Sequence, residues 1–378
     1  MKLVFRCDAS LVIGNGHVMR CLTLAQALRA QGASCRFVSR ADAGHLLEAV
    51  GAQGFEALAL PASTPGLDPD DPAADARQTL AALDGSVADW LVMDHYALDA
   101  RWGRAMRPAA HRLMVIDDLA NRGQDADLLL DQNLGRQDRD YADHLPAAAR
   151  VLTGPAYALL RPGFAARRGP SLAQRAQRPL RQLLLSLGGV DAGNATGQVL
   201  QALRDCALPV GTRISVVMGP SAPWLDAVRR QAARMPWPTE VLLNPPDMAR
   251  LMADSDLAIG GCGSTAWERC CLGLPSLVLV LADNQRAGAL ALARQGSVRL
   301  LPEIADAAPA EGPEHGTSSA DMLAPGSRQR VDLALALQQA LAALAEPPVL
   351  HAMQQAAAKV TDGGGAARVV AAMLACHG

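Results

Sequence analysis

Short apolar segments alternate with alanine-rich or amphipathic stretches along the whole sequence, and most of the apolar segments run into glycine or acidic residues. This alternation is typical of parallel strand–helix–strand units, in which the chain returns to the sheet through a helix. Segments of strand length occur at 3–7, 33–39, 90–94, 112–116, 182–187, 214–218, 240–243, 257–259 and 276–281. Helices are expected at about 17–31, 328–344, 351–359 and 366–376. The pattern predicts an α/β protein with two parallel sheets.

Two stretches interrupt the alternation. Residues 166–181 are rich in Arg, Pro and Gly and lack an apolar period, which predicts an interdomain linker. No aromatic residues lie between the arginines, so a solvated linker is favoured over a nucleic-acid-binding patch. Residues 302–326 are polar and rich in small residues, which predicts a mobile surface insertion. We therefore expect a first domain over 1–165, a second over 182–345 and a helical tail over 346–378.

The composition excludes several classes of protein. The formal net charge of the 378 residues is −2, so no overall field would attract nucleic acid or an anionic membrane. No apolar run approaches the ~18 residues of a membrane span, and the apolar start is too short for a signal peptide. We expect a cytoplasmic monomer. The only lysines are Lys2 and Lys359, which excludes a phosphate-binding loop of the Walker A type. No CxxC or HExxH pattern occurs, and we expect neither a cofactor nor a metal.

The first motif with chemical potential follows the first predicted strand. Gly14 and Gly16 allow a ligand to approach the backbone closely, and His17 opens the next helix. The positive end of the helix dipole favours a neutral imidazole, which a general base requires near pH 7. The alternative is a structural role, in which His17 starts the helix and is hydrogen-bonded to Asp8 or Ser10.

A second glycine turn follows the strand expected at 182–187. Gly188 and Gly189 precede a polar helix start, an arrangement that contacts phosphate in many α/β proteins. The alternative is an ordinary tight turn in which Asn194 caps the helix.

A third turn carries three glycines within four positions, at 260, 261 and 263, before Ser264 and Thr265 open a helix. Free backbone N–H groups there could hold a diphosphate without a lysine or a metal. Glu268 lies one turn into that helix, where its carboxylate could accept both hydroxyls of a ribose. The alternative is a capping box between Thr265 and Glu268. We favour the ligand role, because a cap does not need so many glycines.

Polar residues also follow other predicted strands. Asp94 and His95 end one strand, Asp117 and Asp118 end the next, and Asn284 follows a strand of the second half. Residues beyond the carboxyl ends of parallel strands line the ligand crevice of such sheets. The acidic pairs could suggest a metal site, but no further acidic cluster accompanies them.

Together these motifs resemble a known family. Over about residues 1–300 the sequence is similar to the UDP-2,4-diacetamido-2,4,6-trideoxy-altropyranose hydrolases of pseudaminic acid biosynthesis. The matching residues are Arg6-Cys7-Asp8, Ser10, Ile13-Gly14, Gly16-His17-Val18-Met19-Arg20-Cys21, Leu152, Gly154, Tyr157-Ala158-Leu159-Leu160-Arg161-Pro162, Phe164, Ser186-Leu187-Gly188-Gly189-Val190-Asp191, Asn194, Thr196, Gly263-Ser264-Thr265, Trp267-Glu268-Arg269 and Asn284-Gln285.

The resemblance implies a GT-B fold, in which two Rossmann-like domains face a cleft, as in the UDP-binding glycosyltransferases of peptidoglycan lipid synthesis. It implies that the second domain binds UDP and that His17 of the first domain activates water. The products would be UDP and the free sugar, released with inversion and without a metal. The residues implied to contact substrate or UDP are Gly14, Gly16, Asn194 and Glu268, with Gly188, Gly189, Gly263, Ser264 and Thr265 at the diphosphate and Asp118, Tyr157 and Asn284 in the pocket wall.

Two other functions stay open at this point. A UDP-sugar glycosyltransferase of the same fold would need a lipid or sugar acceptor. A non-catalytic sugar-nucleotide-binding protein would keep the glycine turn before Glu268 but would not need His17.

Overall fold

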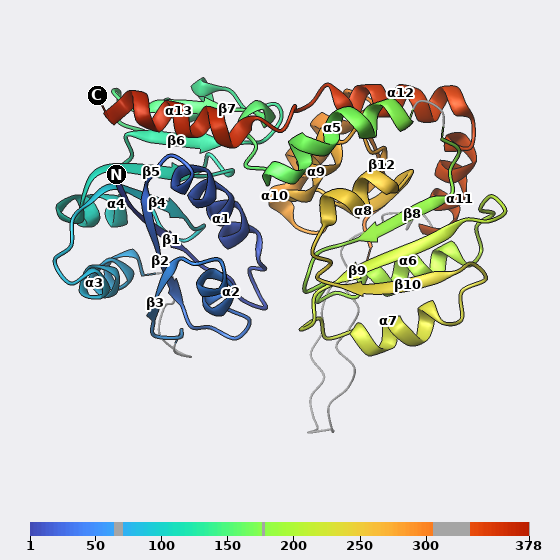
Figure 1. The fold of residues 1–378 in the computed structure, drawn as a ribbon, viewed down its shortest axis with the longest axis horizontal. Helices are drawn as coiled ribbons and strands as arrows, with labels where there is room; N and C mark the ends of the chain where they lie inside the picture. The colour runs from blue at the N-terminus through green and yellow to red at the C-terminus, as the bar shows by residue number, and fades with distance from the viewer. Residues whose placement is uncertain (64–70, 176–177, 305–332, 378) are drawn as a thin grey trace, which may run out of the picture.

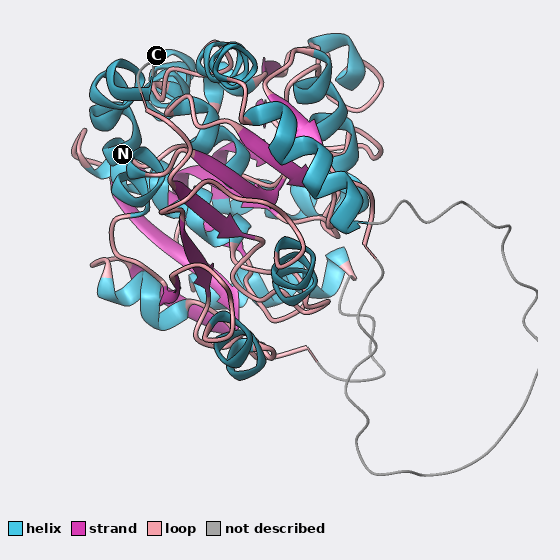
Figure 2. Ribbon diagram, turned by 90° about the vertical axis from the view of Figure 1, so that its right-hand side faces the viewer, coloured by secondary structure: helices cyan, strands magenta, loops and turns pink. Residues whose placement is uncertain are grey.

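The computed structural model describes residues 1–63, 71–175, 178–304 and 333–377. It contains two parallel β-sheets, each flanked by helices on both faces, in two domains that lie side by side (Figure 1). The prediction of an α/β protein with two Rossmann-like domains is confirmed. Figure 2 shows the molecule from the side of the second domain.

The first domain is built on a seven-stranded sheet with the order β3-β2-β1-β4-β5-β6-β7. Its strands are β1 (Lys2–Cys7), β2 (Ser34–Arg40), β3 (Glu56–Leu60), β4 (Ala88–Asp94), β5 (Ala110–Ile116), β6 (Leu128–Asp131) and β7 (Arg150–Thr153). Its helices are α1 (Gly16–Arg29), α2 (Leu47–Ala52), α3 (Pro72–Leu83) and α4 (Ala100–Met106), with short 3-10 turns η1 (Arg107–Ala109), η2 (Asp138–Tyr141) and η3 (Pro155–Tyr157).

The second domain is built on a six-stranded sheet with the order β10-β9-β8-β11-β12-β13. Its strands are β8 (Gln182–Ser186), β9 (Arg213–Met218), β10 (Thr239–Leu243), β11 (Leu257–Gly261), β12 (Ser276–Leu279) and β13 (Val298–Leu300). The remaining helices are α5 (Pro162–Arg175), α6 (Ala195–Leu203), α7 (Leu225–Ala232), α8 (Met248–Asp254), α9 (Thr265–Cys271), α10 (Asp283–Arg294), α11 (Leu333–Leu344), α12 (Pro347–Ala358) and α13 (Gly365–His377).

Both faces of each sheet are buried, which explains why the strands appear as nearly continuous apolar runs. In β1, Leu3 and Phe5 point into the core beside α1 and α13, whereas Val4 points into the core beside α3 and α4. Arg6 points to the same side as Val4, and its Nη2 lies 2.5 Å from Oδ2 of Asp75 on α3. The period of two in the strand thus separates an apolar face from a face that holds a buried ion pair.

The strand order reverses direction once in each sheet. In the first sheet, β1 and β4 are neighbours and the chain winds outward on both sides of them; β8 and β11 hold the same position in the second sheet. Ligands of open parallel sheets bind beyond the carboxyl ends of the strands at such a switch point. The motifs of the sequence fall there, since His17 follows β1, Gly188 follows β8 and Gly263 follows β11.

The predicted linker over residues 166–181 is wrong for its first ten residues, which form the rest of helix α5. This helix packs against α8, α9 and α12. Two of its arginines donate to backbone carbonyls of those helices: Arg168 to Cys271 (2.6 Å) and Ala358 (2.7 Å), and Arg175 to Met252 (2.6 Å). Arg167 stays partly exposed and pairs with Asp247. Carbonyls at helix ends lack partners within the helix, so an Arg-rich helix can be a buried one.

The expected tail consists of helices α12 and α13, and the two pack against different domains. Helix α12 packs against α5, α9 and α11, whereas α13 returns to the first domain and lies against α1 and η3 (Figure 1). Val369 and Met373 of α13 are fully buried in the same core cluster as Leu3. The insertion expected at 302–326 falls almost entirely outside the described residues.

Within the described ranges, no single helix is both long enough and apolar enough to span a membrane. In that part of the chain, α11 and α12 taken together are long and apolar enough, but a bend of 95° separates them.

Candidate active site

A histidine–aspartate pair lies at the switch point of the first domain. His17 stands in the first turn of α1, and its Nδ1 is 2.5 Å from Oδ1 of Asp94, the last residue of β4. Both residues are buried, with His17 6% exposed and Asp94 fully enclosed. The alternative role for His17, a hydrogen bond to Asp8 or Ser10, is not what the structure shows.

Arg20 completes the surroundings of the carboxylate. Its Nε and Nη2 donate to the two oxygens of Asp94, each over 2.6 Å. Burial alone would raise the pKa of Asp94, but attraction to Arg20 and His17 outweighs it and holds the pKa well below its usual range. An ionised carboxylate accepts the Nδ1–H of the imidazole and fixes that tautomer. The Nε2 atom, which has no hydrogen-bond partner among the described residues, is then the basic nitrogen.

Tyr96 connects this pair to the second domain. Its ring packs edge-on against the imidazole of His17, with 4.7 Å between ring centroids. Its hydroxyl donates to Oδ2 of Asp118 (3.0 Å) and accepts from Nδ2 of Asn284 at the start of α10 (2.7 Å). The structure therefore brings His17, Asp118 and Asn284 together, and Asn284 is supplied by the other domain.

Asp118 is the second carboxylate of this group. Its Oδ2 also lies 3.6 Å from Nη1 of Arg20, whereas its Oδ1 is buried without a hydrogen-bond partner in the described part of the chain. Burial raises the pKa of Asp118, and the charge of Arg20 offsets part of that rise.

The glycine loop before His17 faces the second domain. A side-chain carbon at Gly14 or Gly16 would meet no other atom within 4 Å, so both positions border open space. A Cβ added to Gly189 would lie 3.4 Å from Nδ2 of Asn15, which puts the Gly14–Gly16 loop next to the turn after β8. The carboxyl ends of the two sheets thus face each other.

The turn after β8 agrees only in part with the predicted phosphate contact. Gly188 has a φ of +105° and open space where a Cβ would stand, which suits close approach by a ligand. Asn194 instead takes the capping role, because its side chain accepts from the backbone N–H of Gly197 (3.1 Å). Asp191 accepts from the N–H groups of Ala195 and Thr196, so three donors at this helix start are already occupied.

The turn after β11 differs, since its capping box is absent. Ser264 is the N-cap residue and makes no side-chain capping bond, and Thr265 accepts from Arg269 instead. Glu268 points toward the first domain's last loop, where Nη2 of Arg161 lies 3.3 Å from its Oε1. Burial raises the pKa of Glu268, and Arg161 offsets part of the rise.

Tyr157 lies apart from the His17 group. It ends η3 and packs against the core of the first domain, where η3 contacts α13. Among the described residues, no hydrogen bond joins Tyr157 to another predicted site residue, so its place in a pocket wall is a proposal.

An acidic network adjoins Asp118 at the ends of β5 and β6, where Arg136 donates to the carbonyl of Asp118 (3.0 Å) and pairs with Asp131 (3.1 Å). Asp117 pairs with Arg122 (2.9 Å), and Tyr141 donates to Asp131 (2.9 Å), a residue whose pKa burial raises to about 7. Among the residues that the structure describes, no group of three or more His, Cys, Asp or Glu side chains is arranged to hold a metal ion.

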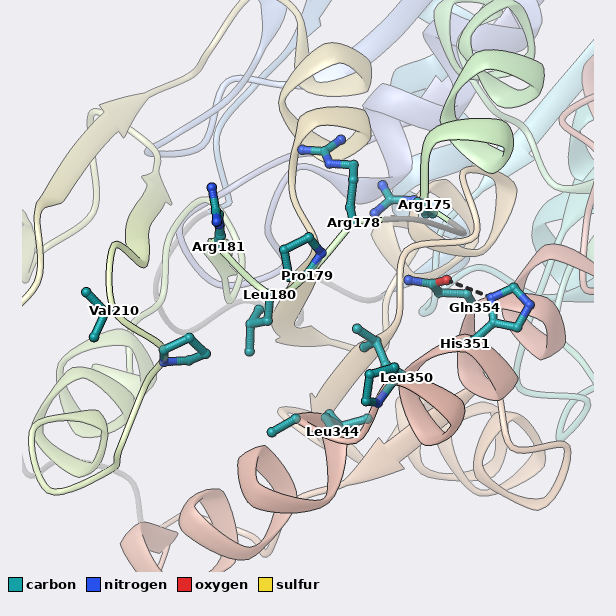
Figure 3. A pocket seen from close by; sticks show the side chains of 13 residues that line it. Arg175, Arg178, Pro179, Leu180, Arg181, Val210, Leu344, Leu350, His351 and Gln354 are labelled. Carbon is teal, nitrogen blue, oxygen red and sulfur yellow. Dashed lines mark hydrogen bonds between the residues drawn. The ribbon is translucent and has the colours of Figure 1, made fainter.

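A further pocket lies away from all of these residues. It has a volume of about 420 Å³ and opens at the amino ends of β8 and β9, next to the start of α12 (Figure 3). Its walls include Arg178, Arg181, Val210, Leu350, His351 and Gln354. None of the predicted site residues lines it.

Sequence reasoning placed Asp94 at the edge of the crevice but did not pair it with His17, and it missed Tyr96 altogether. Its position could have indicated a role, because Tyr96 lies two residues after Asp94, at the end of the same strand. Arg20, Arg161 and Arg269 stood inside the matching motifs, but no role was assigned to them.

Comparison with known proteins supports a distant relationship. No protein-family model matches the chain. It is 25% identical over 292 residues to the uncharacterized protein MJ1062 of Methanocaldococcus jannaschii, covering 76% of this chain and 57% of that one. It is 34% identical over 149 residues to the spore coat polysaccharide biosynthesis protein SpsG of Bacillus subtilis, covering 39% and 42%. The matches thus span about half the length of these two relatives.

A third relative is covered almost completely. The UDP-2,4-diacetamido-2,4,6-trideoxy-beta-L-altropyranose hydrolase of Campylobacter jejuni is 23% identical over 297 residues, which are 78% of this chain and 97% of that enzyme. The expected resemblance is therefore found, as a distant one.

Solved structures confirm the fold. MurG of Acinetobacter baumannii superposes with a TM-score of 0.66 at 18% identity, covering 99% of both chains. A UDP-GlcNAc 2-epimerase of Neisseria meningitidis, solved with UDP-GlcNAc bound, superposes with a TM-score of 0.59 at 11% identity, covering 99% of this chain and 100% of that one. The predicted GT-B fold is confirmed.

Proposed function

We propose that the protein hydrolyses a UDP-linked 2,4-diacetamido-2,4,6-trideoxyhexose to UDP and the free sugar, for the synthesis of a nonulosonate such as pseudaminic acid. In this proposal the second domain holds UDP, and the first domain supplies the general base for the attacking water.

The observation that carries the proposal is the His17–Asp94 pair. A buried carboxylate 2.5 Å from Nδ1 accepts the proton of that nitrogen, so the lone pair of the neutral imidazole lies on Nε2, where a general base needs it. The pair follows β1 and β4 at the switch point, and Asn15 beside it lies next to Gly189 of the second domain. A purely structural histidine would not need an ionised carboxylate to fix its tautomer.

The reaction needs one proton transfer at this base. Nε2 of His17 takes a proton from water while the water oxygen bonds to the anomeric carbon. The bond between that carbon and the diphosphate oxygen breaks, and its electron pair leaves with UDP. Attack opposite the leaving group inverts the anomeric centre. UDP leaves readily, so the second carboxylate that glycosidases use as an acid is not required.

The second domain supplies the nucleotide site in this proposal. The open positions at Gly188 and Gly263 would admit the diphosphate, and Glu268 would accept the ribose hydroxyls. Glu268 now contacts Arg161 of the first domain's last loop, so ribose binding would share or displace that contact. No metal takes part in the proposed chemistry.

The Campylobacter jejuni hydrolase supports this choice of substrate because it is covered over 97% of its length. Likeness in fold to MurG favours one alternative, a UDP-sugar glycosyltransferase with a separate acceptor. A non-catalytic binding protein is a poorer fit, since it gives the His17–Asp94 pair no task.

The deciding experiment measures UDP release from a panel of UDP-linked amino sugars in buffer, with no acceptor added. We expect steady release from 2,4-diacetamido sugars, with the rate unaffected by EDTA. Release only after an acceptor is added would identify a transferase. UDP binding without release under either condition would identify a binding protein.

A further inference from the structure

Arg269 is a buried cation that lacks an anion of its own. It is 1% exposed, and the ion pairs of the described residues include none to its guanidinium. Buried Arg6, Arg20 and Arg40 each pair with an aspartate. Buried Arg175 has no ion pair among the described residues, but it donates with every side-chain nitrogen, to Ser171 or to backbone carbonyls. Arg269 instead donates to the carbonyl of Gly261 (2.6 Å) and to Oγ1 of Thr265 (3.3 Å), and its Nε has no partner in the described part of the chain.

The guanidinium lies directly beneath the glycine turn after β11. A Cβ added to Gly260 would stand 2.5 Å from Nη1 of Arg269 and 2.9 Å from the carbonyl oxygen of Ser186. Gly260 is therefore needed to make room for the arginine. A Cβ added to Gly263 would approach only Nε2 of Gln285, at 3.9 Å. Gly260 thus makes room for Arg269 on the inner side of the turn, and Gly263 leaves open space on its outer side.

The nearby groups do not neutralise this charge. Burial raises the pKa of Cys262 to about 11 and that of Cys270 to about 12, so both thiols are neutral near pH 7. The carboxylate of Glu268 attracts Arg269 through space but forms no ion pair with it among the described residues, and it is in contact with Arg161 instead. A guanidinium stays protonated in proteins even when burial lowers its pKa. Unlike Arg175, Arg269 has both an unpartnered Nε and no ion pair within the described ranges, and a buried charge in that state destabilises the fold unless a ligand compensates it.

We propose that Arg269 is the positioning cation for the diphosphate of the nucleotide. This inference rests on the proposed function, because the anion that Arg269 attracts is the UDP held at the Gly261–Thr265 turn. The arginine acts through the turn, since it orients the Gly261 carbonyl and Thr265 from behind and adds positive charge below the N–H groups. An anion on the outer side then supplies the missing counter-charge, in the role that a lysine or a metal has in other nucleotide sites.

The test separates the charge of Arg269 from its hydrogen bonds. Arg269→Gln keeps a donor for the Gly261 carbonyl but removes the charge, and Arg269→Lys keeps the charge. Calorimetric titration of wild type and both variants with UDP, UMP and uridine measures how affinity depends on phosphate. Thermal unfolding of the ligand-free proteins shows whether the fold is intact.

We expect Arg269→Gln to bind UDP at least tenfold more weakly, to bind uridine within twofold of wild type and to lose no thermal stability. Arg269→Lys should bind UDP within about threefold of wild type. Equal losses for UDP and uridine, or unchanged UDP binding in Arg269→Gln, would overturn the inference. If Arg269→Gln does not fold, a Lys variant that folds but loses UDP binding overturns it as well. Wild type that does not bind UDP would refute the proposed function instead.

Discussion

Replacing Asp94 by Asn tests the active site most directly. The carboxylate accepts from Nδ1 of His17 (2.5 Å) and from Nε and Nη2 of Arg20 (2.6 Å each). An asparagine has the same shape but only one acceptor oxygen. If that oxygen faces Arg20, the amide N–H₂ faces His17, and Nδ1 must then become an acceptor. The imidazole proton moves to Nε2, the atom that should take the proton from water.

The size of the effect follows from these contacts. Loss of a general base usually slows a reaction ~10²–10⁴-fold, and loss of the aspartate that orients a catalytic histidine is in the same range. Removing one partner of a buried ion pair costs ~3–5 kcal/mol. Arg20 keeps Asp118 at 3.6 Å, so we expect the lower value. For a domain of this size, ~3 kcal/mol corresponds to a fall in Tm of roughly 6–12 °C.

The assay is acceptor-free UDP release, measured well below the Tm of every variant. Asp75→Asn is the matched control, because Asp75 is an equally buried aspartate that accepts from Arg6 and Arg40 and does not touch His17. It should lose comparable stability but keep kcat within about twofold. If Asp94→Asn keeps more than a tenth of the wild-type kcat, or if Asp75→Asn loses as much, the role of Asp94 in fixing the tautomer is refuted.

Three further predictions concern separate groups. His17→Gln should lower kcat by ~10²–10⁴-fold while the Kd of UDP, measured by calorimetry, stays within about twofold; a variant with more than a tenth of the rate removes His17 from the mechanism. Glu268→Ala should weaken UDP and uridine alike by ~10–100-fold, since charge-assisted hydrogen bonds contribute ~1.5–3 kcal/mol; unchanged calorimetric affinity argues against the ribose contact. Burial raises the folded-state pKa of Asp131 from 3.8 to about 7. The protonated carboxyl therefore stabilises the fold below about pH 4, and this stabilisation is lost as the pH rises to about 7. Asp131→Asn should therefore be more stable than wild type at pH 8, by less than the ~4 kcal/mol of the pKa difference because it gives up the ion pair to Arg136 (3.1 Å), and show no such gain near pH 4; equal urea midpoints at pH 8 contradict this.

The sequence allowed most of the fold to be predicted, because long buried strands carry their own signal. The strands that it did not reveal are β3, β6, β7 and β13. The last three have three or four residues, and β3 has five residues of which only Leu60 is buried. Leu128–Asp131 has four residues, too few to show a period, and it becomes a strand because Met114–Ile116 offers a paired edge. Helix α5 was hidden for a different reason. Its arginines bind carbonyls of helices distant in sequence, so the segment appears polar although it is packed.

The site was predictable in its positions but not in its pairings. The helix start at His17 and the strand end at Asp94 were both visible in the sequence. That they meet depends on β1 and β4 being neighbours, with Cys7 opposite Asp94, and strand order is a property of the whole sheet. For Asn194 and Glu268, too, the sequence does not show which partner each side chain contacts. Each could cap a helix or bind a ligand, and the neighbouring Gly197 and Arg161 decide which contact forms.

The return of α13 to the first domain has a consequence for biosynthesis. The sheet of that domain is complete at Thr153, yet its core includes Val369 and Met373, which the ribosome makes only after the whole second domain. When the first domain leaves the ribosome, the apolar surface beside α1 is still uncovered, because α13 has not yet been made. Gly365 packs so closely on Ala158 that a Cβ would lie 2.2 Å from its carbonyl oxygen. Docking of α13 joins the two domains in a closing step, and until then the first-made half is the one that needs protection from aggregation.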